Sequence, residues 1–142
     1  MANTIHVEIV SAERAIFSGD VEMVFAPAIM GEVGIAPRHS PLVTQLGPGE
    51  VRVQLEGGQQ DAYYVSGGML EVQPHVVTVL SDTALRAHDI DEAAALKAKE
   101  EAERAMQDQS SEVDYGAAQA SLAEAVAQLQ TLRRMKNRAG RG

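Results

Sequence analysis

Hydrophobic and polar residues alternate with a period of two along roughly the first 87 residues of the chain. The alternation is clearest near residues 5–10, 50–56 and 76–80. A period of two is typical of β-strands that bury one face and expose the other. The positions that we expect to face a core are Ile5, Val7, Ile9, Val51, Val53, Leu55, Val77 and Val79.

Glycine and proline separate these segments at short intervals. Gly57 and Gly58 lie between two alternating runs and predict a β-hairpin, because a tight primed turn needs positive φ angles. Residues 31–34 (GEVG) superficially resemble a phosphate-binding loop, but no helical pattern follows them, so we interpret them as a tight turn. About eight to ten short strands at this spacing predict an antiparallel sandwich or barrel.

Near residue 88 the pattern changes to an alanine-rich stretch with helical periodicity. Asp89 followed by Glu92 resembles a capping box and predicts a first helix over residues 90–107. After a polar turn, Asp114 is the expected N-cap of a second helix over residues 115–138. The large apolar residues of that second helix form one stripe, at Leu122, Val126, Leu129 and Leu132.

A short turn between two helices packs them antiparallel. The sequence therefore predicts a β-sandwich over residues 1–87 and a two-helix hairpin over residues 88–142. Alanine dominates the first helix, and a buried alanine contributes much less than the roughly 1.5–3 kcal/mol of a buried leucine. We therefore expect the hairpin to be stable as helix but loosely held, and hence mobile.

The composition excludes several classes of protein. Among 142 residues there is no cysteine, which rules out disulfides, thiolate metal ligands and cysteine nucleophiles. Apolar residues make up 45% of the chain and aromatic residues only 4%, so the core should be mainly aliphatic. With no secretory leader pattern and no apolar run of membrane-spanning length, we expect a soluble cytoplasmic protein.

The charge is distributed unevenly. The whole chain carries −8, yet five basic and no acidic residues follow residue 126, which leaves −13 on the rest. A helix dipole favours cations at its C-terminal end, but five exceed that need. We interpret this end as a probe for an acidic protein surface, and the acidic remainder argues against nucleic acid.

No pattern of catalytic or metal-binding residues is present. None of the four histidines has a second histidine at metal-ligand spacing, and HExxH, GxxxxGK[ST] and GxGxxG motifs are absent. We therefore predict no catalytic residues, no metal and no cofactor, and a chain that is not an enzyme on its own.

Two long segments carry specific motifs. Residues 31–44 (GEVGIAPRHSPLVT) are followed by Pro48 and Gly49, in the pattern GxxGIxPxHxPLVT…PG. Residues 64–72 (YVSGGMLEV) and 77–84 (VTVLSDTA) form a second block. Together these segments resemble the epsilon subunit family of bacterial F-type ATP synthases, whose blocks occur in the same order along nearly the whole chain.

The resemblance implies a ten-stranded antiparallel β-sandwich followed by a helical hairpin. It also implies a rotor subunit of the central stalk that couples proton flow to ATP synthesis. The sandwich would bind the gamma subunit and the ring of c subunits. The helices would extend into the alpha/beta catalytic head and inhibit ATP hydrolysis. The subunit would be a peripheral protein on the cytoplasmic face of the bacterial inner membrane, meeting the membrane only through the complex.

The resemblance also assigns candidate partner-binding residues. Glu32 falls where the family contacts the polar loops of the c ring, and His39 and Pro41 fall in the loop that lies against gamma. The cations of the second helix would contact an acidic segment of the catalytic beta subunits. They are Arg133, Arg134, Lys136 and Arg138.

One motif of the family is altered here. Some members bind ATP through [IL]DxxRA at the start of the hairpin, and this chain has Ile90 and Asp91 but Ala94 at the arginine position. Asp91 remains a candidate for ATP contact. Because Ala94 supplies no charge for phosphate, we predict weak or absent ATP binding.

Three alternatives to the rotor subunit stay open on sequence. An ATP-sensing module is the first, and Ala94 argues against it. A small hydrolase or metal enzyme is the second, and the absence of catalytic and metal-binding motifs from the sequence argues against it. A carbohydrate-binding sandwich is the third, and the chain's three tyrosines and two phenylalanines are few for aromatic sugar platforms.

Overall fold

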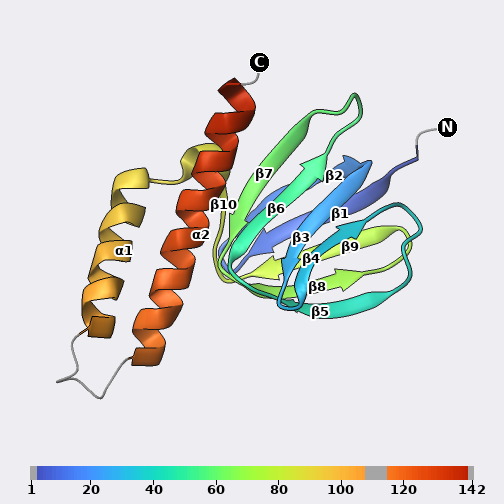
Figure 1. Ribbon diagram of the computed structural model, residues 1–142. Helices are drawn as coiled ribbons and strands as arrows, with labels where there is room; N and C mark the ends of the chain where they lie inside the picture. The colour runs from blue at the N-terminus through green and yellow to red at the C-terminus, as the bar shows by residue number, and fades with distance from the viewer. Residues whose placement is uncertain (1–2, 108–114, 141–142) are drawn as a thin grey trace. The chain divides into compact units, whose positions relative to one another are not determined.

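The computed structural model describes residues 3–107 and 115–140, which divide into two compact units between Arg86 and Ala87. The first unit contains ten β-strands, and the second contains a short 3₁₀ turn and two α-helices (Figure 1). The predicted fold class, a ten-stranded antiparallel β-sandwich followed by a helical hairpin, is confirmed.

The strands follow one another at short intervals, as the glycine and proline spacing predicts. Their bounds are β1 (Ile5–Ser11), β2 (Ala15–Val21), β3 (Met23–Ala28), β4 (Gly31–Ile35), β5 (Leu42–Leu46), β6 (Gly49–Gln54), β7 (Gln60–Val65), β8 (Gly68–Val72), β9 (Val76–Ser81) and β10 (Ala84–Arg86).

The strands pair in the order β10-β7-β6-β3-β5-β8-β9-β1-β2, and β4 pairs with β3. All pairs are antiparallel except β1 with β9, which is parallel. In Figure 1 the two ends of this path curve toward each other, so one face of the sheet encloses the core.

The core is aliphatic, and the predicted inward positions form it. Seven of them, on β1, β6 and β9, are at most 1% exposed, and Leu55 packs partly buried against the same cluster. The alternation sets this outcome because successive side chains of a strand point to opposite faces. All buried members of this cluster lie between Ile5 and Ala84, so the sandwich has a hydrophobic core of its own.

The Gly57-Gly58 hairpin is confirmed between β6 and β7. Both glycines have positive φ, 91° and 88°, which a residue with a Cβ adopts with strain. The interpretation of residues 31–34 as a tight turn is wrong. They begin strand β4, and the turn is formed by Ile29 and Met30, so that Ala28 pairs with Gly31.

The second unit begins with the 3₁₀ turn η1 (Ala87–Asp89), followed by α1 (Glu92–Gln107) and α2 (Tyr115–Gly140). The capping box at Asp89 is wrong: Asp89 lies in η1, and Asp91 Oδ1 accepts a hydrogen bond from the Ala94 N–H at 3.1 Å. Asp91 is therefore the N-cap of α1. The predicted cap at Asp114 lies outside the described residues.

The two helices lie side by side and run antiparallel (Figure 1). Lys136 near the end of α2 donates a hydrogen bond to Glu92 at the start of α1, at 2.9 Å, which joins opposite ends of the two helices. The buried residues of α1 are Ala95 and Ala102, whereas Leu96 is 44% exposed. The apolar burial of α1 therefore comes from small side chains.

Candidate partner-binding sites

The outer face of β8, β9 and β1 carries a row of exposed or half-buried apolar side chains, and Gln45 of β5 continues this row. The register pairs Gln45 with Met69, Met69 with Leu80, and Leu80 with Val10, so these side chains adjoin across four strands. Met69 is 43% exposed and Leu80 is 48% exposed. Contiguous apolar side chains on a solvent-facing sheet are typical of protein contacts. We call Val10, Met69 and Leu80 the apolar row.

A second, more polar row lies beside the apolar row, two residues along each strand. It consists of Val43, Glu71, Thr78 and Glu8, which the register places opposite one another on β5, β8, β9 and β1. Val43 is 66% exposed and extends the apolar surface, whereas the two glutamates give its border a negative charge.

His6 lies on the same face near the edge strand β2. Its Nδ1 lies 3.0 Å from Oδ1 of Asp20, and its Nε2 lies 3.5 Å from Oε1 of Glu8. The hydrogen bond to Asp20 is the main cause that raises the pKa of His6 above its ordinary value. Burial opposes this increase, and the hydrogen bond to Glu8 adds to it. This cluster couples β1 to the edge strand through a titrating group.

The Ser66-Gly67-Gly68 segment fixes the position of Met69. Gly68 has a φ of 130°, and a Cβ added there would overlap the backbone carbonyl of Leu80. The Ser66 hydroxyl lies 3.3 Å from that of Ser81, which donates to the Thr83 carbonyl at 2.8 Å. The chain thus passes from β7 to β8 at close backbone contact with β9, which only glycine permits.

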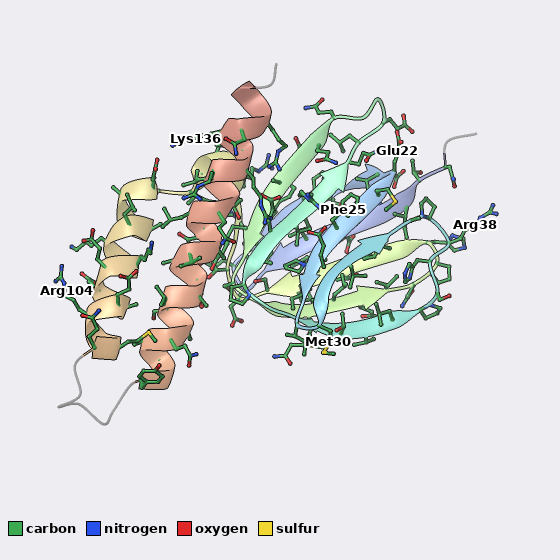
Figure 2. The ribbon with its side chains drawn as sticks, viewed as in Figure 1. Glu22, Phe25, Met30, Arg38, Arg104 and Lys136 are labelled. Atoms are coloured by element: carbon green, nitrogen blue, oxygen red, sulfur yellow. The ribbon has the colours of Figure 1, made fainter. Side chains whose placement is uncertain are left out.

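His39 and Pro41 lie in the loop between β4 and β5. The His39 Nδ1 donates to the Ser40 carbonyl at 2.7 Å, and the His39 N–H donates to the Ala36 carbonyl at 3.2 Å. Arg38 has a φ of 65° and anchors the loop through its N–H to the Pro74 carbonyl at 3.0 Å. Figure 2 shows Arg38 projecting from the sandwich. The loop is thus fixed by backbone contacts, with Pro41 exposed just before β5.

The turn between β3 and β4 forms an apolar tip. Met30 is 92% exposed and Ile29 is 58% exposed. Figure 2 labels Met30 at the end of the sandwich. Glu32 follows on β4, opposite Pro27. Sequence reasoning selected Glu32 but passed over its two apolar neighbours, although they interrupt a stretch where a turn normally carries polar residues.

Arg52 on β6 holds the carboxylate of Glu32. Its Nη2 donates to Glu32 Oε1 at 2.8 Å, and its Nε lies 3.7 Å from Glu50 Oε1. The guanidinium carbon of Arg52 lies 4.7 Å from the centre of the Phe25 ring. Alternation places Arg52 on the outer face between Val51 and Val53, but no sequence pattern names its partners.

The basic residues near the end of α2 have different surroundings. Arg133, Arg134 and Lys136 are exposed, and Arg138 is half-buried. The ammonium of Lys136 pairs with Glu92, with 60% of the Lys136 side chain still exposed (Figure 2). In this arrangement of the hairpin, part of the predicted cationic surface is therefore engaged by α1.

The residues of the altered ATP motif lie at the start of α1. Asp91 is occupied as the N-cap, and its hydrogen bond comes from Ala94, the residue at the arginine position. A groove of about 300 Å³ lies between the two helices, and Lys99, Arg133 and Lys136 contribute its cations. Its apolar side includes Leu129.

Membrane-spanning helices and clusters of metal-binding side chains are both absent from the described residues. No helix there is long and apolar enough to cross a membrane. No group of three or more His, Cys, Asp or Glu side chains is placed to hold a metal ion in residues 3–107 and 115–140.

Two family models match the chain in succession. Residues 4–87 match the ATP synthase delta/epsilon chain beta-sandwich domain. Residues 88–133 match the ATP synthase delta/epsilon chain long alpha-helix domain.

Individual relatives and structures agree with these matches. The ATP synthase epsilon chain of Nitrosococcus oceani is 66% identical over 140 residues, covering 99% of this chain and 100% of the relative. That of Legionella pneumophila is 56% identical over 97% of this chain and 99% of its own length. A chain of the Euglena gracilis mitochondrial ATP synthase (OSCP/F1/c-ring) superposes with a TM-score of 0.70 at 26% identity, covering 98% of this chain and 83% of that one. The protein therefore belongs to the ATP synthase delta/epsilon chain family.

Proposed function

We propose that this chain is the epsilon-type rotor subunit of a bacterial F-type ATP synthase, a non-catalytic subunit of the central stalk. The observation that carries the proposal is the identity of 66% to an ATP synthase epsilon chain across nearly the whole of both chains. The match includes both units. We therefore assign docking to the sandwich and regulation to the helical hairpin within the same proposal.

The outer face of β5, β8, β9 and β1 is the proposed docking surface for gamma. The apolar row supplies area that gains free energy when removed from water, about 25 cal/mol per Å². His39 and Pro41 lie in the loop that leads into β5, beside Val43, so they border the same surface. A rigid sheet is suited to this task because its side chains need little ordering on binding.

The tip formed by Ile29, Met30 and Glu32 is the proposed contact to the c ring. An exposed carboxylate beside apolar side chains suits a polar loop that carries a cation. Contact with that ring would hold the chain at the cytoplasmic face of the inner membrane as a peripheral subunit, and would couple proton translocation to rotation.

The helical hairpin is the proposed brake on ATP hydrolysis. In the side-by-side arrangement Lys136 pairs with Glu92, an exposed contact worth at most about 1 kcal/mol. Small side chains supply the burial of α1. Separation of the helices therefore requires little free energy. It releases Lys136 from Glu92, so that Lys136, with Arg133, Arg134 and Arg138, can contact an acidic segment of the catalytic beta subunits.

Replacement of exposed apolar side chains tests the docking surface. We expect Leu80→Ser and Met69→Ser each to weaken binding to purified gamma at least tenfold, since each loses apolar contact at the centre of an interface. Leu96→Ser on α1, where the side chain is 44% exposed, is the matched control and should bind as the unaltered chain does. Surface plasmon resonance measures the dissociation constants, and normal binding by both sandwich variants would refute the assignment of this face.

An ATP-sensing role is the second candidate, and the groove between α1 and α2 is the observation that favours it. Lys99, Arg133 and Lys136 bring cations to this groove. Ala94 and the engagement of Asp91 as a helix cap oppose it. We predict weak or absent ATP binding, and isothermal titration calorimetry showing micromolar or tighter affinity would establish the sensing role instead.

A further inference from the structure

Four side chains from three strands form a cluster beside the β3–β4 tip: Phe25, Glu32, Glu50 and Arg52. The register places Arg52 on β6 opposite Phe25 on β3, and Phe25 opposite Gly34 on β4. Glu32 lies two residues before Gly34 on β4. To reach Glu32, Arg52 therefore extends across β3, over the Phe25 ring.

The Phe25 ring lies beside Gly34. A Cβ placed at Gly34 would lie 3.5 Å from this ring, an ordinary van der Waals contact. The ring supports the Arg52 guanidinium carbon at 4.7 Å from its centre. A planar guanidinium stacks on an aromatic face while its N–H groups stay directed outward, and an ammonium lacks this geometry.

The charges of the cluster leave one negative charge in excess. Arg52 faces two carboxylates, with Nη2 on Glu32 at 2.8 Å and Nε 3.7 Å from Glu50. The Glu50 side chain is 3% exposed, whereas that of Glu32 is 49% exposed. The buried Glu50 thus balances the positive charge of Arg52 on the inner side of the cluster. The remaining negative charge lies on Glu32, at the surface.

Arg52 binds one of the two carboxylate oxygens of Glu32, namely Oε1. A carboxylate accepts several hydrogen bonds, so Oε2 has capacity for a cation of a partner. Met30 and Ile29, 92% and 58% exposed, lie in the turn just before β4 and present apolar surface beside that position. The tip therefore fits a partner loop in which a basic side chain has apolar neighbours.

We propose that Arg52 is a positioning residue, which holds Glu32 in one orientation at the tip so that its carboxylate meets a basic side chain of the partner's loop. Exposed carboxylates sample several rotamers, and fixing one in advance lowers the entropy lost on binding. The inference rests on the proposed contact between the tip and the c ring, and it adds Arg52, with Glu50 and Phe25 as its supports.

The test compares two binding partners, the gamma–c-ring complex and gamma alone, with the full-length chain and its variants. Arg52→Gln and Glu32→Gln should each weaken binding to the gamma–c-ring complex about tenfold, the loss of one oriented charge contact. Neither should change binding to gamma alone. The double variant should bind no more weakly than either single variant, because both remove the same contact.

A matched control and a second variant keep the test decisive. Arg14→Gln, in the exposed turn between β1 and β2, makes the same change of charge and should leave both affinities unchanged. If Arg52→Gln fails to fold, as loss of binding to gamma alone would reveal, Arg52→Lys decides. It keeps the charge but not the planar fork, and we expect it to bind gamma normally and the gamma–c-ring complex more weakly.

The outcomes separate this inference from the proposed function. Normal binding of Arg52→Gln and Arg52→Lys to the gamma–c-ring complex, with Glu32→Gln impaired, would overturn the positioning role alone. Normal binding by Glu32→Gln would overturn the carboxylate contact and with it the inference. Failure of the unaltered chain to bind gamma or the complex would instead overturn the proposed function.

Discussion

At the scale of single residues, Gly68 has a structural role in the sandwich and His6 has a titrating role. Gly68 belongs to the Ser-Gly-Gly segment that resembles the family pattern, and the structure gives the reason for glycine: a positive φ together with a backbone approach to Leu80. The sequence suggests the importance of the segment but not its cause, because the contact joins β8 to β9 and becomes visible only with the strand pairing.

Replacement of Gly68 should therefore destabilise the folded chain. We expect Gly68→Ala to lower the free energy of unfolding by at least about 2 kcal/mol, because the new Cβ meets backbone and the φ is strained. Gly47→Ala is the control, since a Cβ there has nothing within 4 Å and its φ is ordinary, and it should change stability by about 0.5 kcal/mol or less. Urea denaturation measures both, and equal stability of the two variants would contradict the close approach.

His6 should make the stability of the β1–β2 edge depend on pH. The Asp20 carboxylate raises the pKa of His6 in the folded state, so the folded state binds the proton more tightly than the unfolded state. The stabilisation is fully present below the unfolded pKa, about 6.5, and is lost as pH rises through the raised folded value.

Asp20→Asn should accordingly destabilise the chain at about pH 5.5 and have little effect at about pH 8.5. Asp61→Asn on β7 provides the same substitution away from His6 and should show no such dependence. Chemical denaturation at the two pH values measures this, and NMR titration of the His6 ring should show its pKa falling in Asp20→Asn. An unchanged pKa would refute the pairing.

At the scale of elements, the sequence predicts regular repeats well and local exceptions poorly. The strands that alternate strictly, such as β1 and β6, have the predicted faces buried. The β3–β4 turn was missed because Ile29 and Met30 are apolar at a position where turns are normally polar. The N-cap of α1 is Asp91 and not the predicted Asp89, because η1 occupies residues 87–89. The sequence pattern allows either start, since acidic residues stand at 89, 91 and 92.

Substitution of the cap distinguishes the two aspartates. Asp91→Ala should weaken the first turn of α1 by about 1 kcal/mol, because the Ala94 N–H loses its acceptor. Asp89→Ala should have little effect, and Asp91→Asn should retain most of the stability since asparagine caps equally well. Amide hydrogen exchange at Ala94 and Ala95 reports the change. Faster exchange in Asp89→Ala than in Asp91→Ala would show instead that Asp89 caps the helix, as the capping box predicts.

The candidate sites were also only partly accessible to sequence. Glu32, His39 and Pro41 follow from a motif, and the structure places all three at exposed or half-exposed positions of the sandwich. Met69 and Leu80 were not selected from the sequence, because their adjacency depends on the β8–β9 register. Arg52 required side-chain geometry, since its partners Glu32 and Phe25 come from other strands, β4 and β3.

At the scale of the whole molecule, the chain consists of a unit with a large aliphatic core and a unit with small-residue helix packing. The core cluster ends at Ala84, and the helices begin beyond it. We expect residues 1–88 alone to unfold cooperatively, with the calorimetric and van't Hoff enthalpies equal. A broad, non-cooperative transition would mean that the sandwich needs the hairpin to fold.

In the proposed function, docking and inhibition belong to different units of the chain. The apolar row and the tip belong to the sandwich, and the cations at residues 133–138 belong to the hairpin. Binding and inhibition should therefore separate when the chain is cut between them.

The most direct measurement is ATP hydrolysis by the catalytic head of the host ATP synthase, stripped of this subunit and then titrated with the full-length chain or with residues 1–88. Both should bind, and only the full-length chain should suppress turnover. Equal suppression by residues 1–88, or binding of the full-length chain without suppression, would refute the assignment of docking to the sandwich and inhibition to the hairpin.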